Sequence, residues 1–107
     1  MNNFDERKKA FEAKFIQDEE LNFKLRARRN KLVGEWAAEQ INKSGDENYI
    51  KAVRQSDLEK PGDDDIIDKI FNDFQELNLN ITREDIIKKL QESEKSVKSQ
   101  LFNESDS

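Results

Sequence analysis

The chain is 107 residues long, 40% of its residues are charged, and 24 acidic against 19 basic side chains leave a net charge of -5. This length fits one small domain, and the acidic balance argues against bulk attraction to nucleic acid or anionic lipid. With neither cysteine nor histidine, the chain cannot form disulfides or thiolate metal sites and lacks the usual general base and neutral metal ligand.

The composition favours helix almost everywhere. Proline occurs once and glycine three times, whereas strong helix formers are abundant. Leu, Ile, Val and Phe make up about a quarter of the chain, above the roughly 20% below which highly charged chains tend to be disordered. We therefore expect an all-α fold with a small core. Because the N-terminus is charged and no apolar run approaches membrane-spanning length, we also expect a cytoplasmic protein.

Residues 1–17 carry the first apolar stripe. Phe4, Phe11 and Phe15 fall on one side of a helix wound over residues 4–17. Burying three phenylalanines contributes about 5–9 kcal/mol, whereas ordering about fifteen backbone residues costs roughly 15 kcal/mol. The stripe therefore needs a groove, supplied by the rest of the chain or by a partner. We expect a mobile or extra-helical N-terminal segment; a helix continuous over residues 4–42 is the alternative.

The next two helices follow from local start and stop signals. Asp18, followed by two glutamates, predicts the N-cap of a long helix that ends at Ser44 and Gly45. Asp46 predicts the cap of a shorter helix, which ends before the turn at residues 61–62. The apolar positions are Leu21, Leu25, Leu32, Trp36 and Ile41 in the long helix and Tyr49, Ile50, Val53 and Leu58 in the short one.

Two further helices complete the predicted domain. The acids at residues 63–65 precede a helix with three-and-four apolar spacing. Thr82 with Asp85 resembles a capping box at the start of the last helix. Four amphipathic helices with short connections are commonly arranged as an antiparallel bundle. The sequence thus predicts a small antiparallel four-helix bundle over residues 18–102, preceded by the segment 1–17 and followed by a frayed tail, 103–107.

Two charged clusters call for an interpretation. No acid lies between Leu21 and Gly34, where the basic residues are Lys24, Arg26, Arg28, Arg29 and Lys31. We interpret them first as a solvated helix face partly paired with the acids around Asp63, then as a protein contact, and last as a nucleotide or nucleic-acid contact. The acids Asp63, Asp64, Asp65 and Asp68 lack the loop pattern of a calcium site, so we interpret them as helix caps and expect no metal.

Several stretches of the sequence together resemble one known family. They are Phe4-Asp5-Glu6-Arg7, Ala10-Phe11-Glu12-Ala13-Lys14-Phe15, Ala27-Arg28-Arg29-Asn30-Lys31-Leu32 and Gly34-Glu35-Trp36-Ala37-Ala38-Glu39, followed by Gly45, Tyr49, Val53, Asp57, Gly62 and Asp63. These stretches are similar to the zeta subunit of the alphaproteobacterial F-type ATP synthase. The likeness is dense over the first two-thirds of the chain and continues in the last third mainly as helix pattern, with Ile, Lys and Asn where the family is rich in alanine.

The resemblance implies a non-catalytic inhibitor without cofactor. Zeta subunits are four-helix bundles whose mobile N-terminal segment becomes helical when it inserts at a catalytic alpha/beta interface of the ATPase head, against the central stalk. The implied partners are the alpha, beta and gamma subunits of the head, without nucleic acid or membrane insertion; the free protein would be monomeric, and peripheral to the inner membrane through the ATP synthase. The implied partner-binding residues are Phe4, Asp5, Arg7, Phe11, Glu12, Lys14 and Phe15, with Arg26, Arg28, Arg29 and Lys31 as candidates for secondary docking.

Two other functions stay open at the level of the sequence. One is a helical nucleic-acid accessory protein that acts through the basic stretch 24–31, for which binding would fall steeply with salt. The other is a structural helical bundle without a partner, whose N-terminal helix packs internally. Protection of the N-terminal amides from hydrogen exchange in the free protein would favour this second function.

Overall fold

The computed structural model describes residues 3–105, and this part of the chain contains five α-helices and no strand. The prediction of an all-α fold is therefore confirmed for the described residues. The segment that the sequence left as mobile or extra-helical is a helix from residue 3 onward, followed by a break of one residue. The helices are α1 (Asn3–Gln17), α2 (Glu19–Gln40), α3 (Glu47–Ser56), α4 (Asp64–Glu76) and α5 (Arg83–Ser105).

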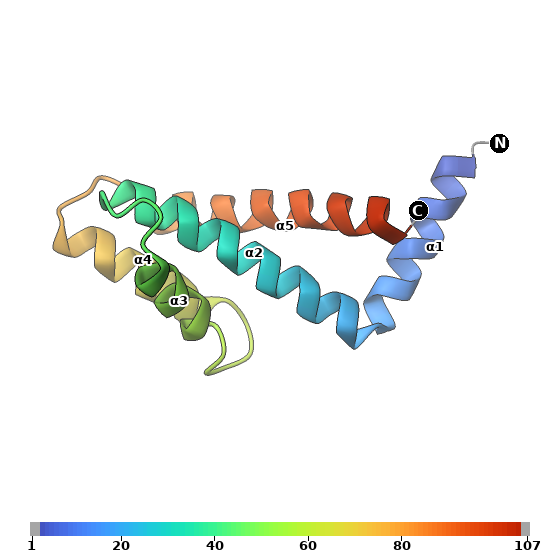
Figure 1. Ribbon diagram of the computed structural model, residues 1–107, viewed down its shortest axis with the longest axis horizontal. Helices are drawn as coiled ribbons and strands as arrows, with labels where there is room; N and C mark the ends of the chain where they lie inside the picture. The colour runs from blue at the N-terminus through green and yellow to red at the C-terminus, as the bar shows by residue number, and fades with distance from the viewer. Residues whose placement is uncertain (1–2, 106–107) are drawn as a thin grey trace.

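The two long helices, α2 and α5, run antiparallel along an elongated molecule that measures 52 × 25 × 23 Å (Figure 1). The shorter helices α3 and α4 pack against this pair toward one end, and α1 crosses the opposite end, beside the end of α5 (Figure 1). The finer prediction of a four-helix bundle is not confirmed. With 10 and 13 residues, α3 and α4 are much shorter than α2 and α5, which have 22 and 23.

Three helix starts follow the capping signals of the sequence. The carboxylates of Asp18 and Asp46 accept hydrogen bonds from backbone N–H groups in the first turns of α2 and α3. The predicted capping box is present: Asp85 Oδ2 accepts from the Thr82 N–H at 3.0 Å, and Thr82 Oγ1 accepts from the Asp85 N–H at 3.1 Å. Because these bonds join residues at most three apart, the local sequence is enough to predict them.

Several details differ from the prediction. The helix α2 ends at Gln40 rather than at Ser44, and α3 ends at Ser56, so Leu58 lies outside the helix and is 76% exposed. Asp63 stands at the N-cap position of α4 but makes no side-chain capping bond. Its carboxylate instead accepts hydrogen bonds from Arg29, so Asp63 has the predicted cap position but not the side-chain capping bond. The last helix continues to Ser105, which makes residues 103–105 helical where the sequence suggested a frayed tail. Residues 106–107 of that tail lie outside the described part of the chain.

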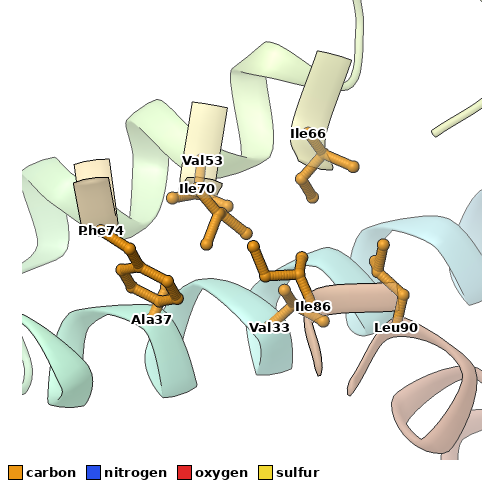
Figure 2. Packing of buried hydrophobic residues seen from close by; sticks show 8 residues of the cluster. All are labelled: Val33, Ala37, Val53, Ile66, Ile70, Phe74, Ile86 and Leu90. Atoms are coloured by element: carbon orange, nitrogen blue, oxygen red, sulfur yellow. The ribbon is translucent and has the colours of Figure 1, made fainter. Parts of the chain in front are cut away.

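The main core lies where α3 and α4 cover α2 and the first half of α5 (Figure 2). Trp36 packs edge-on against Phe74, with ring centroids 5.6 Å apart. Gly34 permits the close approach of α2 and α3, because a Cβ at this position would lie 3.2 Å from Ile50 Cγ2. The side chains buried in this core are Val33, Ala37, Val53, Ile66, Ile70, Phe74, Ile86 and Leu90.

A second, smaller cluster lies at the other end of the long helices. It joins Phe15 of α1 to Leu25 of α2 and to Val97 and Leu101 of α5. Phe11 packs against this cluster from α1. Part of the groove that the N-terminal stripe requires is therefore supplied by the chain itself.

Candidate functional site

The apolar stripe of α1 is buried in a gradient along the helix. Phe15 is 7% exposed and belongs to the second cluster, Phe11 is half-buried at its edge, and Phe4 is 46% exposed. The three aromatic residues predicted to act together as anchors thus differ in how deeply they are buried. Phe15 is a core residue of the free protein, whereas Phe4 and Phe11 keep surface that another protein can contact.

A residue that the sequence did not single out, Phe102, contacts this stripe from α5. Its ring lies edge-on to Phe4 and to Phe11, with ring centroids 5.4 and 5.5 Å apart. These distances and the steep angles between the ring planes suit attractive aromatic pairs. Beside the rings, α1 and α5 line a shared groove. The signal for Phe102 was available in the sequence, because it adjoins Leu101 at the end of an apolar stripe that includes Val97.

The junction between α1 and α2 is a single residue, Asp18, with extended backbone angles. Asn22 reaches back across it: its side-chain N–H group donates to the carbonyl oxygen of Phe15 at 2.7 Å and to that of Asp18 at 2.9 Å. The continuous helix over residues 4–42 is therefore broken at this point. One extended residue between two helices lets α1 take a direction different from that of α2.

Of the charged residues proposed for partner binding, Glu12 lines the groove between α1 and α5, whereas Asp5, Arg7 and Lys14 do not. Asp5, Arg7, Glu12 and Lys14 are all exposed. They do not lie in the second cluster, which contains only apolar side chains. The aromatic rings of α1 thus face α5 together with Lys8 and Glu12 at the groove, and the other charged side chains named here face solvent.

The basic stretch of α2 is largely neutralised within the molecule. Lys24 pairs with Glu20 at 3.5 Å, and Arg28 forms a bidentate contact with Glu104, at 2.5 and 3.0 Å. Arg26 and Arg29 both lie against Asp63, as the pairing interpretation expected. Lys31 is exposed. Pairing within the chain leaves less charge to grip phosphates, which weakens the nucleic-acid interpretation.

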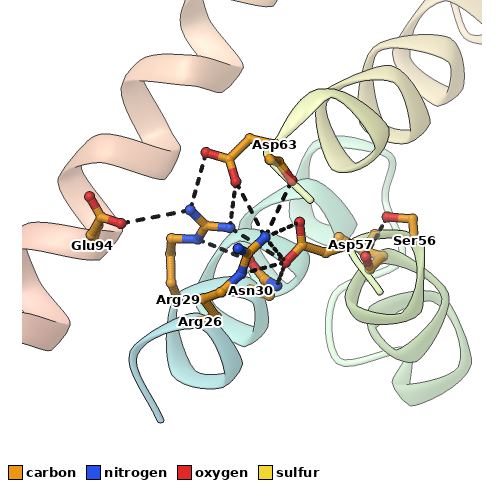
Figure 3. Close-up of polar contacts among 9 residues, drawn as sticks. Arg26, Arg29, Asn30, Ser56, Asp57, Asp63 and Glu94 are labelled. Carbon is orange, nitrogen blue, oxygen red and sulfur yellow. Dashed lines mark hydrogen bonds and ion pairs between the residues drawn. The ribbon is translucent and has the colours of Figure 1, made fainter. Parts of the chain in front are cut away.

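The polar network around Asp57 is the most buried group of charges in the described chain (Figure 3). Only 1% of the Asp57 side chain is exposed, and its oxygens accept hydrogen bonds from Arg26 at 2.9–3.2 Å and from Asn30 at 2.7 Å. Arg29, 4% exposed, lies 3.6 Å from Asp57 and 3.8 Å from Glu94 of α5.

This network ties the loop between α3 and α4 to the two long helices. A buried carboxylate with this many donors is satisfied, so its charge is tolerated in the interior. Asp57 was named in the sequence only as part of the family resemblance, because its partners on α2 lie 27 and 31 positions away. Arg29, proposed for docking, faces the interior here, whereas Arg26, Arg28 and Lys31 keep exposed surface.

An ion pair between Arg28 and Glu104 also fixes the end of α5. The hydrogen bond from Arg28 lowers the pKa of Glu104 below its ordinary value, and the same bond raises the pKa of Arg28. The pair therefore stays charged at neutral pH and joins α2 to the last turn of α5.

The described residues hold no cluster of three or more side chains suited to binding a metal ion. Within residues 3–105, none of the helices is long and apolar enough to cross a bilayer. The charged side chains that are buried here serve contacts between helices.

Comparison with protein families decides the identity. A family model described as ATPase inhibitor subunit zeta matches residues 1–100. The chain belongs to this family. The resemblance seen in the sequence is thereby confirmed. Comparisons with curated proteins and with solved structures find no match for the chain.

The extent of the zeta-family match separates two parts of the site. It covers all of α1 and the polar network around Asp57. Phe102, which contacts α1, and Glu104, which pairs with Arg28 of α2, lie beyond the matched residues. The aromatic contact on the N-terminal helix is therefore a feature of this chain that the family match does not include.

Proposed function

We propose that this protein is a non-catalytic inhibitor of ATP hydrolysis by the F-type ATP synthase. In this proposal α1 inserts at a catalytic alpha/beta interface of the head, against the gamma subunit, and blocks rotation in the hydrolytic direction. Membership of the zeta family supports the inhibitor role. The protein would then be cytoplasmic and peripheral to the inner membrane through the ATP synthase, and monomeric when free.

One observation carries the assignment of α1 as the inhibitory element. Its aromatic stripe is only partly covered by the chain itself, with Phe4 46% exposed and Phe11 half-buried. An amphipathic helix with incompletely buried anchors is the form in which a helix binds a groove of another protein. The side chains of Asp5, Arg7, Glu12 and Lys14 are exposed and would make polar contacts at the rim of that groove.

The rest of the chain would serve as the docking body. Residues 18–102 would rest on the head and keep α1 at a high local concentration near its groove. The Asp57 network suits this role, because it fixes the α3–α4 loop against α2 and α5. Arg26, Arg28 and Lys31, which keep exposed surface, are the candidates for a secondary contact.

Inhibition of ATP hydrolysis by the cognate enzyme tests this function. We expect full-length protein to inhibit, and Phe11→Ala to raise the half-inhibitory concentration at least tenfold, which corresponds to about 1.4 kcal/mol. Phe23→Ala is the matched control, since it truncates the same residue type on α2, where Phe23 is 69% exposed and makes no ring contact in the described chain. Equal inhibition by all three proteins would show that the aromatic stripe serves only the protein's own fold.

A truncation experiment must respect the second cluster. Deleting residues 1–17 would remove Phe15 and expose Leu25, Val97 and Leu101. Loss of inhibition would then not distinguish removal of the inhibitory helix from destabilisation of the remaining domain. Deleting residues 1–13 keeps Phe15 and removes Phe4 and Phe11. We expect this shorter deletion to abolish inhibition while the helical circular dichroism of residues 14–107 is retained.

A further inference from the structure

Three rings form an aromatic clasp at the end of the molecule. We use this name for Phe4 and Phe11 of α1 together with Phe102 of α5. Phe102 lies 5.4 Å from Phe4 at 87° and 5.5 Å from Phe11 at 71°, as measured between ring centroids and planes. One side chain of α5 thus contacts both of the α1 rings that keep exposed surface.

The position of Phe102 is held from both sides. Leu101, the preceding residue, is buried in the second cluster with Phe15 and Val97. Two residues further on, Glu104 accepts two hydrogen bonds from Arg28 of α2. The last turn of α5 is therefore fixed on the body of the protein, and Phe102 is presented to α1 from a fixed position.

The two rings covered by Phe102 are the same rings that the proposed function assigns to the partner groove. A ring packed edge-on against Phe102 cannot at the same time be enclosed in a groove of another protein. We propose that Phe102 holds α1 against α5 in the free protein and competes with the ATP synthase for Phe4 and Phe11. Opening of the clasp then precedes insertion of α1; this inference rests on the proposed function.

The clasp is weak enough to open. Phe4 remains 46% exposed while in contact, and the deeper anchor of α1, Phe15, belongs to a different cluster. A binding-competent state that is only partly populated lowers apparent affinity by its population. Two exposed aromatic pairs, each at the weak end of the ordinary range, reduce the open population by about fivefold. Removing Phe102 should strengthen inhibition by this factor, the opposite of the effect of truncating an anchor.

The first test is Phe102→Ala, which removes the clasp and leaves both anchors on α1 intact. We expect amide hydrogen exchange over residues 4–14 of the free protein to become faster, while exchange in the core of α2 stays unchanged. The half-inhibitory concentration should fall about fivefold. Phe23→Ala, the same truncation on an exposed site outside the clasp, should change neither quantity.

The second test locks the clasp. Lys8 of α1 and Asn103 of α5 line the same groove, and the chain has no cysteine of its own. Cysteines introduced by Lys8→Cys and Asn103→Cys can therefore be joined selectively by a thiol-cleavable bismaleimide. We expect the cross-linked protein to lose inhibition and to recover it when the linker is cleaved. The uncross-linked double variant controls for the substitutions themselves.

The outcomes separate this inference from the proposed function. Unchanged exchange in α1 of Phe102→Ala, or undiminished inhibition by the cross-linked protein, would overturn the clasp as a competitor. Faster exchange with unchanged or weaker inhibition would also overturn it. If the unmodified protein does not inhibit at all, the proposed function fails and competition fails with it, whereas the exchange data still decide whether Phe102 holds α1.

Discussion

Replacing Asp57 with asparagine tests whether the buried polar network holds the α3–α4 loop in place. The substitution keeps the size of the side chain but removes its charge. It also turns one of two accepting oxygens into an N–H donor. Both oxygens face donors in the native protein: Arg26 Nη2 lies 3.0 Å from Oδ1, and Asn30 Nδ2 lies 2.7 Å from Oδ2. Whichever way the amide turns, one donor faces another.

The expected loss of stability depends on how many contacts of the network remain in Asp57→Asn. Removing one partner of a buried ion pair typically costs about 3–5 kcal/mol. Here the loss is smaller, because Arg29 keeps Asp63 at 2.9 Å and the side chain of Arg26 is 42% exposed and can be solvated. We therefore expect Asp57→Asn to lower the free energy of unfolding by about 2–3 kcal/mol. For a domain of this size the melting temperature should fall by roughly 8–12 °C.

Urea unfolding followed by the fluorescence of Trp36 measures this change, because Trp36 packs on Phe74 in the main core. The matched control is Asp68→Asn, which also removes a carboxylate paired with an arginine, at 2.6 Å, but between side chains that are about half exposed. The control should cost less than about 1 kcal/mol. A loss below about 1 kcal/mol for Asp57→Asn as well would refute the idea that burial makes this network important for stability.

Three further predictions concern single contacts. Gly34→Ala should destabilise by about 1 kcal/mol despite the better helix propensity of alanine, because its Cβ meets Ile50 at 3.2 Å; urea unfolding checks this. Thr82→Ala should cost about 1 kcal/mol and unfold the start of α5, detectable by faster amide exchange there. Hydrogen bonds from the backbone N–H and then from the hydroxyl of Thr82 lower the pKa of Asp85 below its ordinary 3.8. The stability that Asp85 contributes is therefore present above that pH and is lost as the pH falls through the lowered value. Because Thr82→Ala keeps the backbone N–H, the larger cause, it should flatten this acid limb of the stability curve only in part.

Much of the helical plan could be predicted because its causes are local. The starts of α2, α3 and α5 depend on side chains that cap backbone groups no more than three residues away. The break at Asp18 follows from the same kind of bond. The family resemblance likewise depends on runs of neighbouring residues, and the family match over residues 1–100 confirmed it.

The residues that were misread or missed depend on distant partners. Asp63 has the sequence position of a helix cap, yet its carboxylate binds Arg29, 34 positions earlier. Phe102 was the last residue of the predicted bundle and was not singled out, yet it meets Phe4 and Phe11 from the other end of the chain.

The sequence by itself determined that α2, α3, α4 and α5 are helical, where they begin, and to which family the chain is similar, because hydrogen bonds within one turn and the spacing of apolar residues depend on neighbouring positions. It left the state of the N-terminal segment open. Only the tertiary structure decided which side chains surround each of the three rings of α1 and how deeply each ring is buried. Phe15 is enclosed by Leu25, Val97 and Leu101, whereas Phe4 and Phe11 meet Phe102 and keep exposed surface. Burial depends on which distant side chains surround a residue, and the spacing along one helix does not contain that information.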